Sequence, residues 1–137
     1  MDSIDDFKMS MDELNNMTPY DFEKYCDRLD SFVNELNKTD DITNVDELIN
    51  ILSDFTFGNI LYIMSFENLQ IMESHLYTAA LLHLCNRGYE KECKFYSSIL
   101  NCYYPGVFDK MMNDLIEKEE YEKCASLQKY KNITKIN

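Results

Sequence analysis

The chain has 137 residues, enough for one domain with a hydrophobic core. It holds 25 Asp and Glu against 13 Lys and Arg, which gives a formal net charge of −12 at pH 7. Such an acidic chain argues against direct binding to nucleic acid, whose phosphates need cationic partners, and against binding to an anionic membrane surface. Only three Gly and two Pro are present, and the scarcity of these helix-breaking residues favours an all-α fold.

The negative charge is concentrated in the first half of the chain. Residues 1–60 carry four Lys or Arg against fifteen Asp or Glu, a net charge of −11, whereas residues 61–137 carry nine against ten, a net charge of −1. We expect a single domain, 1–137, in which a tail (1–17) precedes an acidic helical part (18–60) and a helical-hairpin part (61–132).

Five cysteines are present, an odd number: Cys26, Cys85, Cys93, Cys102 and Cys124. The first residues are acidic and lack the apolar segment of a signal peptide, and no apolar run reaches membrane-spanning length. We therefore expect a cytoplasmic protein with free, mostly buried thiols. The excess of Lys over Arg, together with many Asn, Ile and Tyr, suggests an AT-rich genome, such as that of a phage, a large DNA virus, a low-GC bacterium or a protist. For a viral protein the compartment would be the host cytoplasm.

The first strong element is a helix that begins at Thr18. Residues 1–17 are polar without a clear period, so a disordered tail and a short helix are both open there. Thr18 is a good N-cap and Pro19 suits the first helical position. Apolar residues then recur in steps of three and four, as on one helix face. They are Phe22, Tyr25, Leu29, Phe32, Val33 and Leu36. After a polar linker at 38–44, a second helix is expected over residues 45–55.

The stretch 55–64 leaves two alternatives open. Gly58-Asn59 between two apolar runs suits a β-hairpin turn, and the glycine equally suits a helix end. We favour the helix, because both neighbours are helical and an isolated hairpin is only marginally stable. Further helices are expected from Ser65 to about Arg87, from Tyr89 to about Asn101, from about Val107 to Lys118 and from Glu119 to about Lys131, with a turn at 102–106.

The second half repeats itself. Tyr-Glu-Lys occurs at Tyr89 and again at Tyr121, each time where the second helix of a pair is expected to begin. Each unit is predicted to be an antiparallel helical hairpin that buries one stripe of each helix. The predicted fold is therefore all-α, with about six helices and hairpins in its C-terminal half.

Residues 69–131 resemble tetratricopeptide-type helical repeats, whose period is about 34 residues. The second hairpin also resembles the UvrB/UvrC-type (UVR) motif, with its acidic-Tyr-Glu-x-Ala-Ala-x-Leu core. The matching residues are Glu120, Tyr121, Glu122, Cys124, Ala125 and Leu127. Glu92 departs from the first pattern, where a small residue is expected, and Gln128 departs from the second, where a basic residue is expected. Both families bind other proteins through such hairpins, so the resemblance implies a protein-interaction role.

Reactive residues are few. His75 and His83 lie eight residues apart, which is not the i, i+4 spacing of a helical metal pair. His83 can be drawn together with Cys85, Cys93 and Cys102 as a zinc set, but no C-x-x-C element is present and buried structural cysteines are the better interpretation. No phosphate-binding glycine loop, nucleophile elbow or zinc-protease motif occurs. We expect no enzyme, no catalytic residue, no cofactor and no metal.

Two groups of residues are candidates for partner binding. Glu23, Asp27 and Asp30 are spaced by four and three, so they share one helix face. Such a face can attract a basic groove, although a solubilising surface accounts for it as well. Aromatic residues at turns and helix starts suit interfaces, or can cover the edge of a core. Those here are Tyr89, Tyr103, Tyr104 and Tyr121.

The expected function is that of a small acidic adaptor or regulatory protein that binds another protein through its helical-hairpin surface. Two alternatives remain open. The first is an acidic nucleic-acid mimic that inhibits a DNA- or RNA-binding host protein. The second is a structural protein that assembles with its own copies as a homo-oligomer. Neither direct nucleic-acid binding nor membrane binding is expected.

Overall fold

The structure is a computed structural model that describes residues 4–36, 43–52, 65–87 and 89–131. Within these ranges it contains seven α-helices, one 3-10 helix and one π-helical segment, and no strand. The expected all-α fold is confirmed for this part of the chain. The stretch 55–64, where helix and hairpin were both open, lies outside the described residues.

The N-terminal part places short elements around one long helix. Its elements are η1 (Ile4–Phe7), α1 (Met11–Asn16), α2 (Pro19–Leu36) and α3 (Thr43–Ile51). Of the two alternatives for the first residues, a short helix is present. Phe7 is wholly buried, its ring packs against Phe32, and its carbonyl accepts a hydrogen bond of 2.9 Å from the Tyr25 hydroxyl. These contacts hold η1 against α2.

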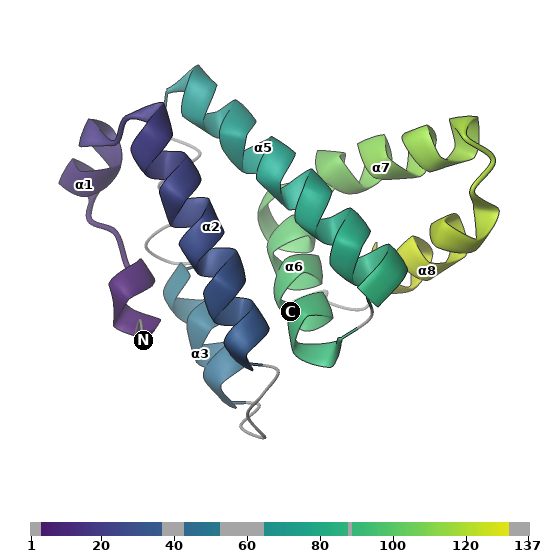
Figure 1. Ribbon diagram of the computed structural model, residues 1–137, viewed down its shortest axis with the longest axis horizontal. Helices are drawn as coiled ribbons and strands as arrows, with labels where there is room; N and C mark the ends of the chain where they lie inside the picture. The colour runs from purple at the N-terminus through teal and green to yellow at the C-terminus, as the bar shows by residue number, and fades with distance from the viewer. Residues whose placement is uncertain (1–3, 37–42, 53–64, 88, 132–137) are drawn as a thin grey trace.

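The C-terminal part continues with five elements. They are α5 (Phe66–Ala80), the π-helical segment η3 (Leu81–Arg87), α6 (Glu90–Tyr103), α7 (Pro105–Glu117) and α8 (Tyr121–Lys131). In Figure 1, α5 packs beside α2, α6 lies next to both, and the α7–α8 hairpin forms one end of the molecule. The N-terminal elements η1 and α1 lie at the opposite end.

Side-chain caps begin the two longest helices. Thr18 Oγ1 accepts a hydrogen bond of 3.1 Å from the Asp21 backbone N–H, while Asp21 Oδ2 accepts one of 3.4 Å from the Thr18 N–H. Ser65 Oγ accepts a hydrogen bond of 3.2 Å from the Asn68 N–H. The predicted helix starts at Thr18 and Ser65 are confirmed, because these side chains satisfy N–H groups that a helix leaves unpaired at its first turn.

The turn expected at 102–106 is wrong. Cys102 and Tyr103 belong to the last turn of α6, and Tyr104 alone separates that helix from Pro105, the first residue of α7. A proline at the first helical position needs no hydrogen bond from its nitrogen, and its fixed φ already suits a helix. The two helices therefore meet at a sharp corner, and α7 begins two residues before the expected Val107.

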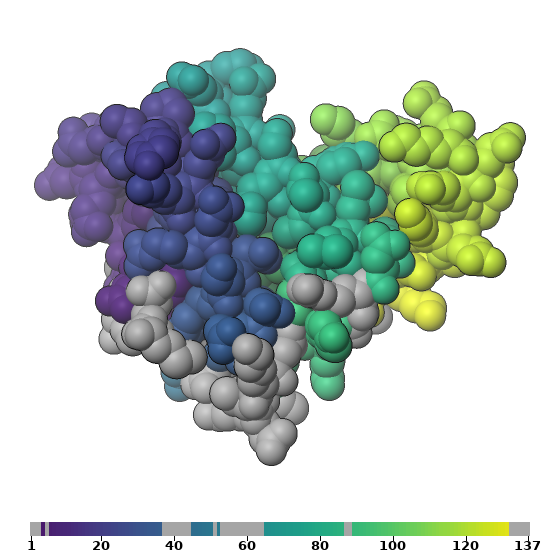
Figure 2. All heavy atoms as spheres, in the orientation of Figure 1, coloured from purple at the N-terminus to yellow at the C-terminus, as the bar shows by residue number. Residues whose placement is uncertain are grey.

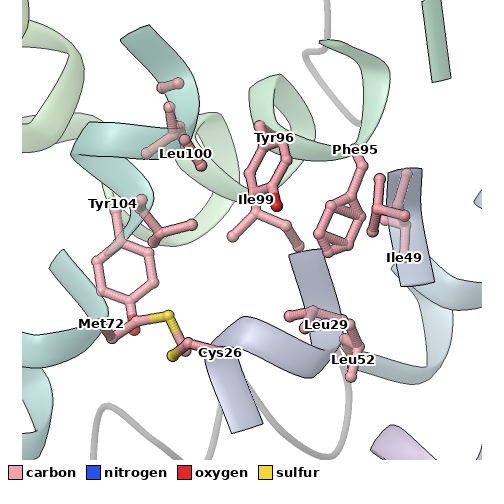
Figure 3. Close-up of a cluster of buried hydrophobic side chains, with 14 of the residues drawn as sticks. Cys26, Leu29, Ile49, Leu52, Met72, Phe95, Tyr96, Ile99, Leu100 and Tyr104 are labelled. Carbon is pink, nitrogen blue, oxygen red and sulfur yellow. The ribbon is translucent and has the colours of Figure 1, made fainter. Parts of the chain in front are cut away.

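Helix α6 lies at the centre of the core. All its residues from Glu92 to Leu100 are buried except Lys94, and the helix packs against α2, α3, α5, η3, α7 and α8. Figure 3 shows Phe95 beside Ile49 of α3, while Tyr104 at the end of the helix lies against Met72 of α5. One central helix thus holds the acidic first part and the hairpin part together.

Candidate functional site

Two of the predicted tyrosines are exposed at helix starts. Tyr89 directly precedes α6 and is 53% exposed, and Tyr121 is the first residue of α8 and is 62% exposed. The repeated Tyr-Glu-Lys therefore begins the second helix of each hairpin, as expected. Ile116, near the end of α7, is also exposed. Each hairpin presents an aromatic ring to solvent at the same position.

The other two predicted tyrosines line a groove between α5 and the α6–α7 corner. The groove has a volume of about 830 Å³, and its walls include Tyr77, Tyr103 and Lys110. Tyr104 also lines it but is 5% exposed, so this side chain belongs mainly to the core. The Tyr77 hydroxyl donates a hydrogen bond of 2.5 Å to Asp114 Oδ2 of α7. In Figure 2 the groove opens where the surfaces of α5 and α7 diverge. We call it the aromatic groove.

A second groove runs between α2 and α5. It has a volume of about 800 Å³ and contains two residues of the predicted acidic face, Glu23 and Asp27, both exposed. Tyr20 from α2 and Glu67 from α5 also line it, as does His75. We call it the acidic groove. Two of the three residues of the acidic face predicted from the sequence thus lie in one wall of this groove.

The two grooves share the exposed side of α5. Gln70, Ser74 and Thr78, which are spaced by four, line both of them. Helix α5 therefore has residues of α2 on one side and residues of the α6–α7 corner on the other, although these are about 80 positions apart in the sequence. The structure places Tyr89 and Tyr121 outside both linings.

Asp30, the third predicted acidic residue, has a different environment. Its Oδ1 atom lies 3.3 Å from His83 Nε2 and accepts a hydrogen bond from the Tyr96 hydroxyl. His83 Nδ1 lies 2.7 Å from Glu92 Oε2, and both of these side chains are wholly buried. The His83 and Tyr96 rings are stacked with centroids 5.1 Å apart. We call Asp30, His83, Glu92 and Tyr96 the buried polar cluster.

The cluster joins three elements. α2 supplies Asp30, η3 supplies His83, and α6 supplies Glu92 and Tyr96. The wider π-helical turn of η3 follows α5 directly, and such turns are frequent at functional sites. The Cys93 thiol also donates a hydrogen bond of 3.0 Å to the His83 carbonyl. His83 is thus held in place through contacts to its backbone carbonyl and to its imidazole ring.

The electrostatics of the cluster favour a charged Asp30. The hydrogen bond from His83, together with that from Tyr96, holds the pKa of the Asp30 carboxyl below its usual value, against the opposing effect of burial. Burial and the neighbouring Asp30 carboxylate raise the pKa of the Tyr96 hydroxyl well above its ordinary range. Tyr96 therefore acts as a neutral hydrogen-bond donor, and Asp30 as an ionised acceptor.

The thiols of Cys26 and Cys85 are poor nucleophiles. Burial raises the pKa of Cys26 to about 12 and that of Cys85 to about 11, so both stay protonated at neutral pH. The residues drawn as a zinc set, His83, Cys85, Cys93 and Cys102, do not form a group of possible metal ligands in the described part of the chain. In the described ranges, the grouping that offers metal ligands is Asp30, His83 and Glu92 instead.

The cluster was missed at the level of the sequence, although one signal was present. Glu92 stands in the hairpin pattern where a small residue is expected, and the structure shows a carboxylate buried there against His83. A charged residue at a core position of a helical pattern normally requires a partner. That signal pointed to Glu92, but no spacing in the sequence pointed to Asp30 or His83 as its neighbours.

None of the helices in the part of the chain that the structure describes is long and apolar enough to cross a membrane. The sequence matches no protein-family model, and the search of curated proteins and the search of solved structures each gave no match.

Proposed function

We propose that the protein acts by binding another protein across the exposed side of α5 and the two grooves beside it. One observation carries this proposal: residues from α2 and from the α6–α7 corner line two open grooves that share α5 as a common wall. Grooves of this kind between helices suit an extended or helical segment of a partner. The role is that of an adaptor or regulator, without catalysis.

The charge of the grooves specifies the kind of partner. Glu23, Asp27 and Glu67 line the acidic groove, whereas the aromatic groove is lined by Glu73 and Lys110, which have opposite charges. Opposite charge steers association and fixes the orientation of two surfaces. We therefore expect a partner segment that carries both basic and apolar side chains. Its Lys or Arg would contact the acidic groove, and its apolar side chains would contact Tyr77 and Tyr103.

Inhibition by nucleic-acid mimicry is a narrower form of the same proposal. Glu23 and Asp27 are exposed and lie one turn apart, so they can present two charges to a basic groove of a nucleic-acid-binding protein. Asp30, the third residue of that expected face, is held by His83 and Tyr96. Charge reversal at Asp30 would disturb the buried polar cluster, so Glu23 and Asp27 are the residues with which to test the mimic.

The experiment is an affinity capture from lysate of the source cells, eluted with a salt gradient and read by mass spectrometry. Four baits are compared: the wild type, Glu23→Gln with Asp27→Asn, Tyr103→Ala, and a control with Glu117→Gln and Glu122→Gln. The control removes the same charge from exposed positions on α7 and α8, away from the grooves.

A partner retained by the wild type and the control, but lost from both groove variants, would support the proposal. Elution of a DNA- or RNA-binding protein at modest salt, with dependence on Glu23 and Asp27 only, would support the mimic. A partner retained equally by all four baits would refute binding at these grooves. Recovery of the bait alone, with a mass that rises with concentration, would favour self-assembly.

A further inference from the structure

We propose that Asp30, His83 and Glu92 form a binding site for a divalent transition-metal ion, with Zn²⁺ as the representative. The site is independent of the two grooves and of the proposed function. One ligand atom from each of the three residues lies within 4.8 Å of the other two. One imidazole and two carboxylates are a donor set found in protein zinc sites.

The carboxylates of Asp30 and Glu92 converge beside the imidazole ring of His83. In an imidazolium that bridges two carboxylates, the ring nitrogens donate in nearly opposite directions, and the carboxylates lie on opposite sides of the ring. Here an oxygen of Asp30 and an oxygen of Glu92 lie within 4.8 Å of each other. The two carboxylates therefore approach a common space beside His83.

The hydrogen bond to Asp30 decides which nitrogen of His83 is available. An ionised carboxylate can only accept, so the 3.3 Å contact between His83 Nε2 and Asp30 Oδ1 is a hydrogen bond only if Nε2 carries the hydrogen. In the neutral ring Nδ1 then has the free lone pair. A histidine that donates one N–H to a carboxylate and offers the other nitrogen to a metal is a recurrent arrangement.

Nδ1 of His83 is buried and makes no aligned hydrogen bond to any described residue, although Glu92 Oε2 lies only 2.7 Å away. Two lone pairs that face each other at this distance repel unless a cation lies between them. A proton on Nδ1 is one such cation, since 2.7 Å is an ordinary length for a charge-assisted hydrogen bond, and a metal ion is the other. Zn²⁺ bound at about 2 Å to each atom in tetrahedral geometry would hold the two atoms about 3.3 Å apart, so the side chains would separate by about 0.6 Å as the ion binds.

The site is also accessible. The Asp30 side chain is 39% exposed, whereas His83 and Glu92 are wholly buried. An ion can therefore enter beside Asp30 and leave one coordination position for water. Bound there, it would connect α2, η3 and α6, which belong to the acidic part and the hairpin part of the chain. The ion would act as a structural or regulatory link between them.

The test uses the full chain after treatment with a chelator and dialysis. Zn²⁺ is titrated in competition with a chromophoric chelator, and we expect one ion per chain. Glu92→Gln should weaken binding by more than about 100-fold, and Asp30→Asn, which replaces a carboxylate ligand and removes the charge that orients His83, by about 10- to 100-fold. The matched control is Glu90→Gln, two residues away on α6 and exposed, which should bind as the wild type does.

Cobalt provides a second measurement, because the chain also contains five thiols. With Co²⁺ we expect the visible bands of a four-coordinate nitrogen and oxygen site. A thiolate-to-metal charge-transfer band would show that cysteines bind the ion, and this would overturn the proposal. Equal affinity of the Glu92→Gln and Glu90→Gln variants would overturn it as well.

If Glu92→Gln does not fold, chemical unfolding of the wild-type chain in the presence of Zn²⁺ still tests the proposed site. A site present only in the folded chain must raise the midpoint of chemical unfolding as the Zn²⁺ concentration rises. An unchanged midpoint in saturating Zn²⁺ would contradict the proposal and leave a proton as the cation between His83 and Glu92.

Discussion

Tyr-Glu-Lys stands at the start of both α6 and α8, but the two helices have opposite environments. In α6 the residues from Glu92 to Leu100 are buried except Lys94, whereas in α8 the buried residue is Leu127. In the part of the chain that the structure describes, α6 packs against six elements, whereas the main neighbours of α8 are α7, η3 and α6. The local motif fixes where a helix starts, but the number of neighbours decides how much of it is buried.

The difference in burial between α6 and α8 goes with a difference in the side chains at equivalent positions. Three residues after the repeated tyrosine, α6 carries Glu92 and α8 carries Cys124. Glu92 is wholly buried against His83, while Cys124 is half-buried near the surface of the hairpin. A carboxylate in the crowded centre needs a cationic or donating partner, whereas a thiol at the edge does not. Of these two helices, α6 alone therefore contributes to the buried polar cluster.

The largest effect is expected from Phe95 and Leu127, which each lie six residues after the tyrosine of Tyr-Glu-Lys and are both wholly buried. Phe95→Ala should lower the free energy of unfolding by about 3–5 kcal/mol, because it leaves a cavity among tightly packed helices. Leu127→Ala should cost about 2 kcal/mol, near the low end of its class, because α8 can move to fill the space. Urea denaturation of both variants measures the difference. Equal losses would show that α8 is packed as tightly as α6.

The second prediction compares two glutamates on α6. Glu92→Gln should cost about 1–3 kcal/mol of stability in metal-free buffer, because the buried group loses its charge beside His83. Glu90→Gln, at an exposed position on the same helix, should change stability by less than about 0.5 kcal/mol. Chemical denaturation of both variants gives the comparison, and a neutral Glu92→Gln would mean that the carboxylate contributes nothing to folding.

A smaller loss is expected at the start of α5. Ser65→Ala removes the oxygen that accepts from the Asn68 N–H and should cost about 1 kcal/mol. The N-cap of α6, Tyr89, makes no side-chain hydrogen bond of this kind to the first turn. Ser31→Ala, at an exposed position within α2, is the control and should be nearly neutral in thermal unfolding. A similar loss at both serines would argue against the cap.

Another prediction concerns pH. Burial lowers the pKa of His75, whose ring lies 6.4 Å from that of Tyr96, below its ordinary value of 6.5. The unfolded chain therefore binds a proton at His75 as the pH falls below about 6.5, while the folded chain binds it only at lower pH. Stability should fall with pH in this window, and His75→Gln should have a shallower slope. Unfolding midpoints measured from pH 7.5 to 5 test this, and identical slopes would contradict it.

The smallest effect on folding is expected at the exposed ring of α8. Tyr121→Ala should change the free energy of unfolding by less than about 0.5 kcal/mol, because the side chain is 62% exposed. Circular dichroism during urea unfolding is sufficient to measure it. A loss above about 1 kcal/mol would show that Tyr121 stabilises the α7–α8 hairpin and would remove it from the candidates for partner contact.

Much of the helical structure could be predicted from local chemistry. Thr18 and Ser65 cap the helices that follow them, and the apolar spacing after Pro19 describes the buried face of α2. The corner at Tyr104 could not be predicted in the same way. The pair Pro105-Gly106 is typical of turns, but here the proline occupies the first position of α7 because α6 and α7 pack directly against each other.

The sequence by itself determined that the chain folds into amphipathic helices, where several of them begin, and that its first half is strongly acidic. These properties depend on residues within a few positions of one another. Tertiary structure alone decided that α6 is the central helix, that Glu23 and Asp27 line a groove with α5, and that Asp30, His83 and Glu92 converge. Most of those contacts join residues of α2 to residues forty or more positions further along the chain, and their formation depends on how all the helices share one core.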